Sequence, residues 1–176
     1  GRHQKNNAAI ALMVLYLFKK QKRNINLSQA VQAIENVIIP GRYEQICSTP
    51  SIIIDGAHNP NGMEVFLQTM WQNKKHRINH LIFAGFKDKA LATMLKMAEP
   101  FFDTITLTTF AHERAISVTE LGNLCHHPNV HLESDWKRLI NHLLTQETID
   151  TDEGYFVVGS FHFISLVRQF IKGLEM

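Results

Sequence analysis

The stretch SIIIDGAHNPNG, residues 51–62, decides how the rest of the chain is organised. Its three consecutive isoleucines, Ile52 to Ile54, are apolar and β-branched, which is typical of a short strand buried on both faces. The Asp-Gly pair that follows ends the strand, because glycine permits a sharp turn and the close approach of another group. Asn59 can then cap a helix whose first residue is Pro60. The stretch therefore predicts a strand that passes through a short loop directly into a helix.

This loop is the strongest candidate in the sequence for a functional site. It carries Asp55, His58 and Asn59 between the strand and the helix. In open α/β sheets, ligands bind at the carboxyl ends of the strands, and the unpaired N–H groups at a helix start attract anions. His58 has a simpler interpretation as a surface imidazole bonded to its own loop, but its place directly after a strand favours function.

Strand and helix patterns then alternate along the chain. An edge strand is expected over residues 43–48, and further strands over residues 80–84, 104–108, 130–132 and 155–158. Apolar residues at helical spacing follow the strands, and the first such stripe is Met63, Phe66, Leu67, Met70 and Trp71.

Polar residues mark where two of these helices begin. Asp88 is expected to cap the helix after the strand at 80–84, while Ser117 and Glu120 have the spacing of a capping box. Five strand–helix units with short connections predict an α/β fold with a Rossmann-like, doubly wound, mostly parallel sheet and helices on both faces.

The residues before this alternation form a helical segment. Helices are expected over residues 4–20 and 27–36, the second with Val31 and Ile34 facing inward, and the Pro40-Gly41 break separates a region 1–39 from a domain 40–176. The run from Ala8 to Phe18 makes the first helix apolar on almost every side, as in buried helices, although it is too short to cross a bilayer. We therefore expect the sequence to begin inside a larger protein, and this helix to self-associate when its upstream core is missing.

The composition excludes several classes of function. A net charge of +2 demands neither nucleic acid nor an anionic membrane as a partner. Cys47 and Cys125 lack the spacing of metal ligands, which favours reduced thiols in a cytoplasmic protein. The ten histidines are scattered without an HxH or HExxH pair, so no dedicated metal site is expected. Neither G-x-G-x-x-G nor G-x-x-x-x-G-K-[ST] occurs, so neither of these phosphate-binding loops is present.

In a parallel sheet, all the strand-to-helix loops lie at one edge, at the carboxyl ends of the strands. That edge would gather Asp55, His58 and Asn59 with polar residues of the other loops, namely Arg42, Lys87, Asp88, Lys89, His112, Arg114, Ser160 and His162. Carboxylates, cations and a hydroxyl together suit a phosphorylated or zwitterionic ligand. On these residues alone, the chain could be a lobe of an enzyme, a stand-alone α/β module that binds a small anion or regulates, or a structural interaction domain.

Four motifs carry a resemblance to a known family: PGRYEQI (40–46), IIIDGAHNPNG (52–62), FKDK (86–89) and VVGSFHFISLVR (157–168). Together they resemble the folylpolyglutamate synthase/dihydrofolate synthase family of the Mur-ligase superfamily. The opening GRHQKNNAAIALMVL is similar to the closing helix of that family's central ATPase domain. The resemblance therefore covers the whole chain, but only the C-terminal part of the family's protein.

The resemblance implies an activity and its cofactors. It implies that ATP phosphorylates a folate or dihydropteroate carboxylate, and that the amino group of L-glutamate then attacks the acyl phosphate. ATP and Mg²⁺ would be the cofactors, with the P-loop and the main magnesium ligands in an upstream domain. The nucleotide-binding residues implied are Arg42, Asp55, His58 and Asn59, of which Arg42 and His58 would be catalytic. The substrate-binding residues implied are Lys89 and Ser160.

Overall fold

The computed structural model describes residues 2–21, 24–37, 39–73, 75–146 and 150–174, and the chain divides into two compact units, Gly1–Pro40 and Gly41–Met176. The division falls at the Pro-Gly break, where Gly41 adopts a positive φ of 72°. No helix among these residues is long and apolar enough to cross a membrane.

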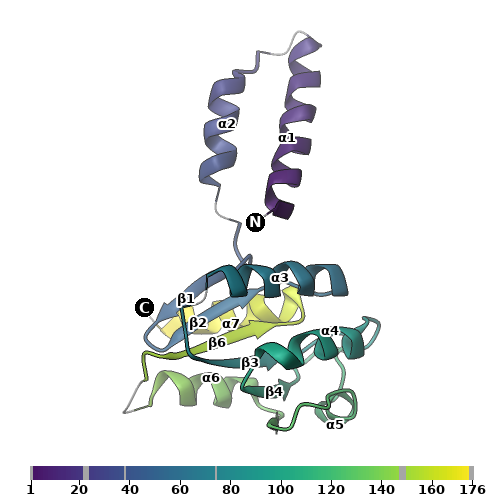
Figure 1. Cartoon of the computed structure of the whole chain (residues 1–176), viewed down its shortest axis with the longest axis vertical. Helices are drawn as coiled ribbons and strands as arrows, with labels where there is room; N and C mark the ends of the chain where they lie inside the picture. Colours follow the sequence, from purple (N-terminus) through teal and green to yellow (C-terminus); the bar gives the residue numbers. More distant parts are fainter. Residues whose placement is uncertain (1, 22–23, 38, 74, 147–149, 175–176) are drawn as a thin grey trace. The chain divides into compact units, whose positions relative to one another are not determined.

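The first unit is a pair of packed helices, α1 (Arg2–Lys20) and α2 (Leu27–Asn36) (Figure 1). The side chain of Asn26 caps α2 by accepting from the N–H groups of Ser28 and Gln29 at 3.0 and 3.2 Å. Within residues 7–37, every side chain that the structure describes is exposed or only half-buried. Val31, expected to face inward, is exposed, because two helices alone cannot cover it. The large exposed apolar residues of α1 are Ile10, Met13, Val14, Tyr16, Leu17 and Phe18.

The second unit is built on a six-stranded sheet with the spatial order β1-β2-β6-β3-β4-β5. The strands are β1 (Glu44–Ser48), β2 (Ser51–Asp55), β3 (Ile78–Phe83), β4 (Thr104–Thr108), β5 (Val130–Glu133) and β6 (Glu153–Val158). Only β1 is antiparallel to its neighbour; the other four pairings are parallel, which confirms the predicted mostly parallel sheet. β6, the last strand in the chain, lies between β2 and β3.

Helices cover both faces of this sheet (Figure 1), as a doubly wound fold requires. One face carries α3 (Pro60–Gln72), α4 (Leu91–Ala98), the short η1 (Glu99–Phe101) and α5 (Val118–Gly122); the other carries α6 (Trp136–Leu144) and α7 (Phe161–Leu174). Successive strand residues point to opposite faces, so Ile53 joins the first core while Ile52 and Ile54 join the second. The predicted burial of β2 on both faces is confirmed.

Two of the predicted helix starts are confirmed and one is wrong. Asn59 caps α3, and Ser117 forms the capping box with Glu120. Asp88 does not cap α4, whose N-cap position is Ala90 without a side-chain bond, because Asp88 pairs with Arg114 of the next loop instead. The carboxylate therefore joins two loops and does not start a helix.

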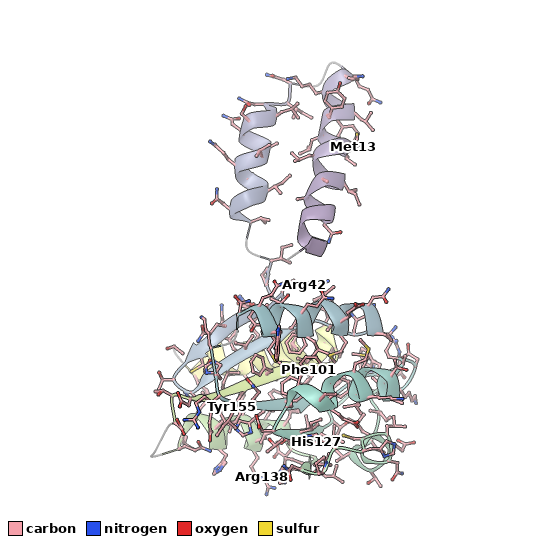
Figure 2. All side chains as sticks on the ribbon, in the orientation of Figure 1. Met13, Arg42, Phe101, His127, Arg138 and Tyr155 are labelled. Carbon is pink, nitrogen blue, oxygen red and sulfur yellow. The ribbon has the colours of Figure 1, made fainter. Side chains whose placement is uncertain are left out.

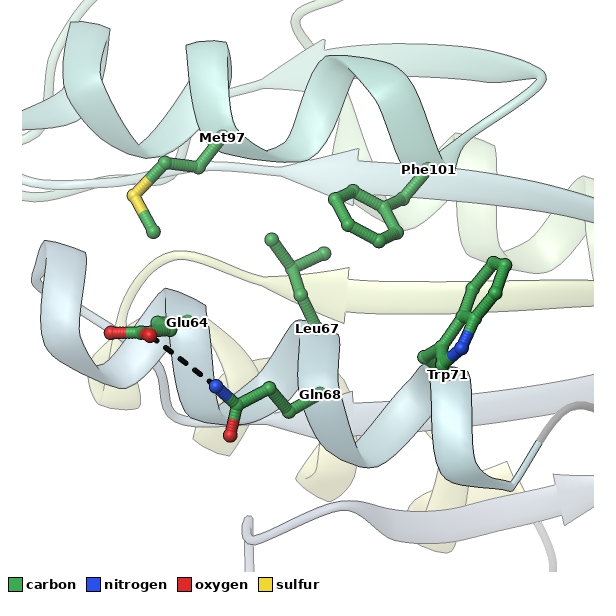
Figure 3. Close-up of a pocket in the computed structure, with 6 residues that line it drawn as sticks. All are labelled: Glu64, Leu67, Gln68, Trp71, Met97 and Phe101. Atoms are coloured by element: carbon green, nitrogen blue, oxygen red, sulfur yellow. Dashed lines mark hydrogen bonds between the residues drawn. The ribbon is translucent and has the colours of Figure 1, made fainter.

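Trp71 is the one residue of the apolar stripe of α3 that is not buried. Its exposed fraction is 59%, and its ring meets Phe101 edge-on with the centroids 6.3 Å apart. The two rings border a groove of about 540 Å³ between α3 and α4–η1 (Figure 3), which Glu64, Leu67, Gln68 and Met97 also line. None of the predicted site residues lines this groove, and Glu64 is the single charged residue among the described residues that line it.

Candidate functional site

The order of the strands sets which loops can meet. The carboxyl ends of parallel strands share one edge, and β6 lies between β2 and β3, so the loop after β6 reaches the loops that follow both neighbours. The N–H of Gly159 donates to the carbonyl of Ala57 in the loop after β2 at 3.1 Å. A Cβ atom on Gly159 would lie 2.4 Å from the carbonyl oxygen of Ala84, which follows β3. Gly159 therefore occupies the point at which three loops converge.

Gly159 also turns the chain into α7. Its φ is 119°, a conformation that L side chains rarely adopt, so both sterics and backbone require glycine here. The next residue, Ser160, is 1% exposed, and its Oγ accepts the N–H of His162 at 3.2 Å. Ser160, predicted to contact substrate, is thus placed as the buried start of α7.

The Arg42 loop is held against the end of β2 by its own backbone. The carbonyl of Gly41 accepts the N–H of Gly56 at 2.8 Å, and the N–H of Tyr43 donates to Oδ2 of Asp55 at 2.9 Å. Tyr43 has a φ of 45°, an uncommon backbone conformation for a residue with a large side chain. These bonds fix the path of the loop, while the side chain of Arg42 itself remains exposed (Figure 2).

Glu44 anchors the same loop to α7. Its carboxylate accepts the N–H of Gly41 at 2.7 Å and the Nε–H of Arg168 at 3.0 and 3.1 Å. Burial opposes ionisation of Glu44, but the Gly41 N–H and the Arg168 guanidinium outweigh it and lower the pKa of the carboxyl. The ionised carboxylate therefore connects residues 124 positions apart in the sequence.

Asp55, predicted to bind nucleotide, uses both carboxylate oxygens to hold backbone. Oδ1 accepts the N–H of Ala57 at 2.8 Å, while Oδ2 holds Tyr43 of the Arg42 loop. Burial raises the pKa of Asp55, against the lowering effect of the two N–H donors and the charge of Arg42. Asp55 thus ties the loop after β2 to the loop that carries Arg42.

Asp55→Ala is expected to lower the free energy of unfolding of the chain by about 2 kcal/mol, because two backbone N–H groups lose their acceptor. Since the folded-state pKa of Asp55 lies above its unfolded value, its contribution is greatest below the unfolded pKa and falls as pH rises through the folded one. The loss should therefore be larger in acidic buffer than at neutral pH, as measured by urea titration. Asp152→Ala is the control, since the side chain of Asp152 pairs, among the described residues, only with the exposed Arg77; an equal loss there would contradict the prediction.

His58 and Asn59 complete the loop after β2. Nδ1 of His58 donates to the carbonyl of Gly56 at 2.9 Å, the bond to its own loop that the simpler interpretation expects. That bond directs Nε2 away from the loop, where it can meet a ligand. Oδ1 of Asn59 accepts the N–H of Gly62 at 2.7 Å, so Asn59 starts α3.

A second group of polar residues joins the loops after β3 and β4. Arg114 donates to both carboxylate oxygens of Asp88 at 2.9 and 2.8 Å, and Nζ of Lys89 lies 3.4 Å from the same carboxylate. The guanidinium of Arg114 also stacks over Phe86 at 4.7 Å. The hydrogen bonds from Arg114 lower the pKa of Asp88, which keeps the carboxylate charged. Lys89, the other predicted substrate-binding residue, is therefore part of an ion-pair network.

The loop after β6 reaches both groups. The ring of His162 lies 5.2 Å from that of His112 and 6.0 Å from that of Phe86, beside Arg114. The ring of Phe161 lies on the opposite side, against Arg42 and His58. The structure thus brings the predicted residues to one edge in two groups, one around Arg42, Asp55 and His58 and the other around Asp88.

Sequence reasoning missed Phe161 as a site residue. The signal in the sequence is an aromatic residue directly after the Gly-Ser pair that ends the last strand, within the VVGSFHFISLVR motif. A metal centre is not evident either: the described part of the chain holds no group of three or more His, Cys, Asp or Glu side chains placed to bind an ion.

Residues 41–161 match the model of the family described as "Mur ligase, glutamate ligase domain". The chain therefore belongs to this family. The match begins at Gly41, the first residue of the second unit, and ends at Phe161, so it contains both groups of polar residues at the sheet edge.

Individual relatives show which enzymes the chain is similar to. It is 27% identical to the dihydrofolate synthase/folylpolyglutamate synthase of Bacillus subtilis over 173 residues. This alignment covers 98% of this chain and 40% of the relative. Escherichia coli FolC in complex with DHPP and ADP has the same fold, with a TM-score of 0.78 and 19% identity over 92% of this chain and 38% of that one. The bifunctional folylpolyglutamate synthase/dihydrofolate synthase of Yersinia pestis, with AMPPNP and Mn, gives a TM-score of 0.69 and 22% identity over 87% and 36%. The chain thus spans about two fifths of the length of these enzymes.

Proposed function

We propose that the domain of residues 40–176 is the C-terminal lobe of an ATP-dependent ligase that adds L-glutamate to folate or dihydropteroate through an acyl-phosphate intermediate. Residues 1–39 would be the helical tail of the upstream ATPase domain and its linker. The observation that carries the proposal is the exposed Arg42, which contacts the same Phe161 ring as His58 at the carboxyl edge of the sheet, in a chain of the Mur ligase, glutamate ligase domain family. The similarity to the Bacillus subtilis synthase supports the same substrates.

The proposed chemistry needs negative charge neutralised and two substrates held in line. The guanidinium of Arg42 is permanently charged and can donate to phosphate oxygens. With its Nδ1 bonded to the carbonyl of Gly56, His58 has Nε2 left to hydrogen-bond a ligand. The ammonium group of Lys89 can pair with a carboxylate of the incoming glutamate. Ser160 fixes the start of α7.

ATP and Mg²⁺ are the proposed cofactors, and they fit this chain differently. Cations at the sheet edge suit the phosphates of ATP, whereas the described residues offer no cluster of ligands for a metal ion. When bound, Mg²⁺ would neutralise phosphate charge, held mainly by residues outside this chain. We also propose a cytoplasmic location, which the free thiols of Cys47 and Cys125 support.

The proposal predicts a G-x-x-G-K-[ST] loop in the coding sequence upstream of Gly1, and activity only in the complete protein. ADP release by that protein should require L-glutamate together with either dihydropteroate or a reduced folate, and the two acceptors separate dihydrofolate synthase from folylpolyglutamate synthase activity. The 176-residue chain assayed alone should release none. Absence of glutamate-dependent ADP release from the complete protein would contradict the proposal, and robust release by the chain alone would show that it is catalytically complete and not one lobe of a ligase.

A further inference from the structure

The ring of Phe161 connects the two residues proposed for catalysis. The guanidinium carbon of Arg42 lies over this ring, 4.6 Å from its centroid, and the imidazole of His58 lies 5.4 Å away at an interplanar angle of 50°. The three residues come from different segments: the loop before β1, the loop after β2 and the start of α7. Phe161 is 37% exposed, so filling the core is not its main role.

Two glycines form a seat for this ring. A Cβ atom on Gly56 would lie 2.2 Å from Cε1 of Phe161, so the ring packs directly on the backbone of the loop after β2. A Cβ atom on Gly41 would lie 3.9 Å from the same ring atom. The orientation of Phe161 is therefore set by backbone on one side, which leaves its remaining surface to the cation and the imidazole.

The ring matters more for Arg42 than for His58. His58 has a second restraint in its hydrogen bond to Gly56. Among the residues that the structure describes, Arg42 has neither an ion pair nor a side-chain hydrogen bond, and the ring is the contact that orders its side chain. Stacking uses the face of the guanidinium and leaves its N–H groups, which lie in the plane, available to an anion.

We propose that Phe161 is a positioning residue, whose ring holds the guanidinium of Arg42, and secondarily the imidazole of His58, in the orientation that the ligase reaction uses. The inference rests on the proposed function for its chemistry, but the placement of Arg42 by the ring stands on geometry alone. Phe161 touches neither nucleotide nor glutamate in this role; it acts through Arg42.

The placement is tested in the 176-residue chain by NMR, without any activity. Protons of the Arg42 side chain should show the upfield ring-current shifts expected over an aromatic face, and Phe161→Leu should abolish them while circular dichroism stays unchanged. Phe161→Tyr, which keeps a ring, should preserve them. Phe101→Leu removes a phenylalanine from the groove beside α3 and should leave the Arg42 signals alone. Arg42 signals that do not respond to Phe161→Leu would overturn the inference.

The consequence is tested in the complete enzyme by steady-state kinetics. Phe161→Leu should lower kcat about tenfold with little change in the KM for ATP, and Phe161→Tyr should restore most of the rate. In the double variant with Arg42→Ala, the loss of the ring should slow the enzyme much less than it does in the wild type, because only His58 is then left for the ring to position. Effects that multiply would overturn the positioning role. If the wild-type enzyme has no ligase activity, the proposed function is wrong. The NMR result would still decide whether the ring orients the side chain of Arg42.

Discussion

Arg42→Ala in the complete enzyme is expected to lower kcat by about tenfold to a thousandfold, with a much smaller change in the KM for ATP. Arg42 is exposed on a loop whose backbone is fixed by Gly56 and Asp55, so its side chain can reach phosphate charge without rearranging the lobe. Such a contact would form when the two lobes enclose the substrates, and it would therefore act mainly on the transition state. Initial rates at varied ATP and L-glutamate measure both parameters.

Two variants make this test specific. Arg77→Ala removes another arginine, 85% exposed and paired with Asp152 just before β3 at the opposite edge of the sheet, and should leave kcat unchanged. His58→Ala should change the KM for ATP as well as kcat, because His58 lies in the loop that directly follows β2. If folded Arg42→Ala and His58→Ala enzymes both keep near-normal kinetics, the carboxyl edge of the sheet is not the catalytic face.

Gly159→Ala is expected to cost about 3 kcal/mol of the free energy of unfolding. A methyl group there meets the backbone oxygen of Ala84 and Cε2 of Phe83 at 2.4 and 2.9 Å, on a residue whose φ is 119°. Backbone strain and overpacking each cost on the order of 1–3 kcal/mol, and neither the carbonyl nor the strand can easily move away. Urea denaturation of the 176-residue chain, followed by circular dichroism, measures the change.

Gly173→Ala provides the matched control. It lies near the end of α7, and a Cβ atom there would meet none of the described residues outside its own helix within 4 Å. Alanine should stabilise that helix by about 0.5 kcal/mol, because glycine is a poor helix former. Similar losses from both substitutions would show that the converging loops at Gly159 are not the reason for its cost.

Most of the second unit could be predicted from the sequence because its elements depend on local patterns. The isoleucines of β2, the Asn59 cap and the capping box at Ser117 all appear in the structure as the sequence indicates. Asp88 was mispredicted because a partner 26 residues away, Arg114, outweighed the local preference for capping. Neighbouring residues carry no signal for such a pair.

The candidate site could be predicted as a place but not as a set of contacts. The parallel order of the strands was enough to gather Asp55, His58 and Ser160 at one edge. The sequence could not show that Asp55 binds backbone N–H groups, or that the ring of Phe161 contacts both Arg42 and His58, because these contacts join three separate segments. The packing of the Phe161 ring on Gly56 and the bonds of the Asp55 carboxylate exist only once the loops have assembled.

The central place of β6 has a consequence for how the lobe is made during protein synthesis. A ribosome completes the β1–β2 pair and the β3–β4–β5 group before it reaches residues 153–158, yet β2 and β3 are connected in the sheet only through that late strand. Until then, each nascent half exposes an apolar strand edge with open hydrogen-bonding groups, which is a template for wrong pairing. The lobe therefore becomes a single cooperative structure only when almost all of its chain has been translated, and the loop that places Ser160 and Phe161 arrives with the strand that closes the sheet.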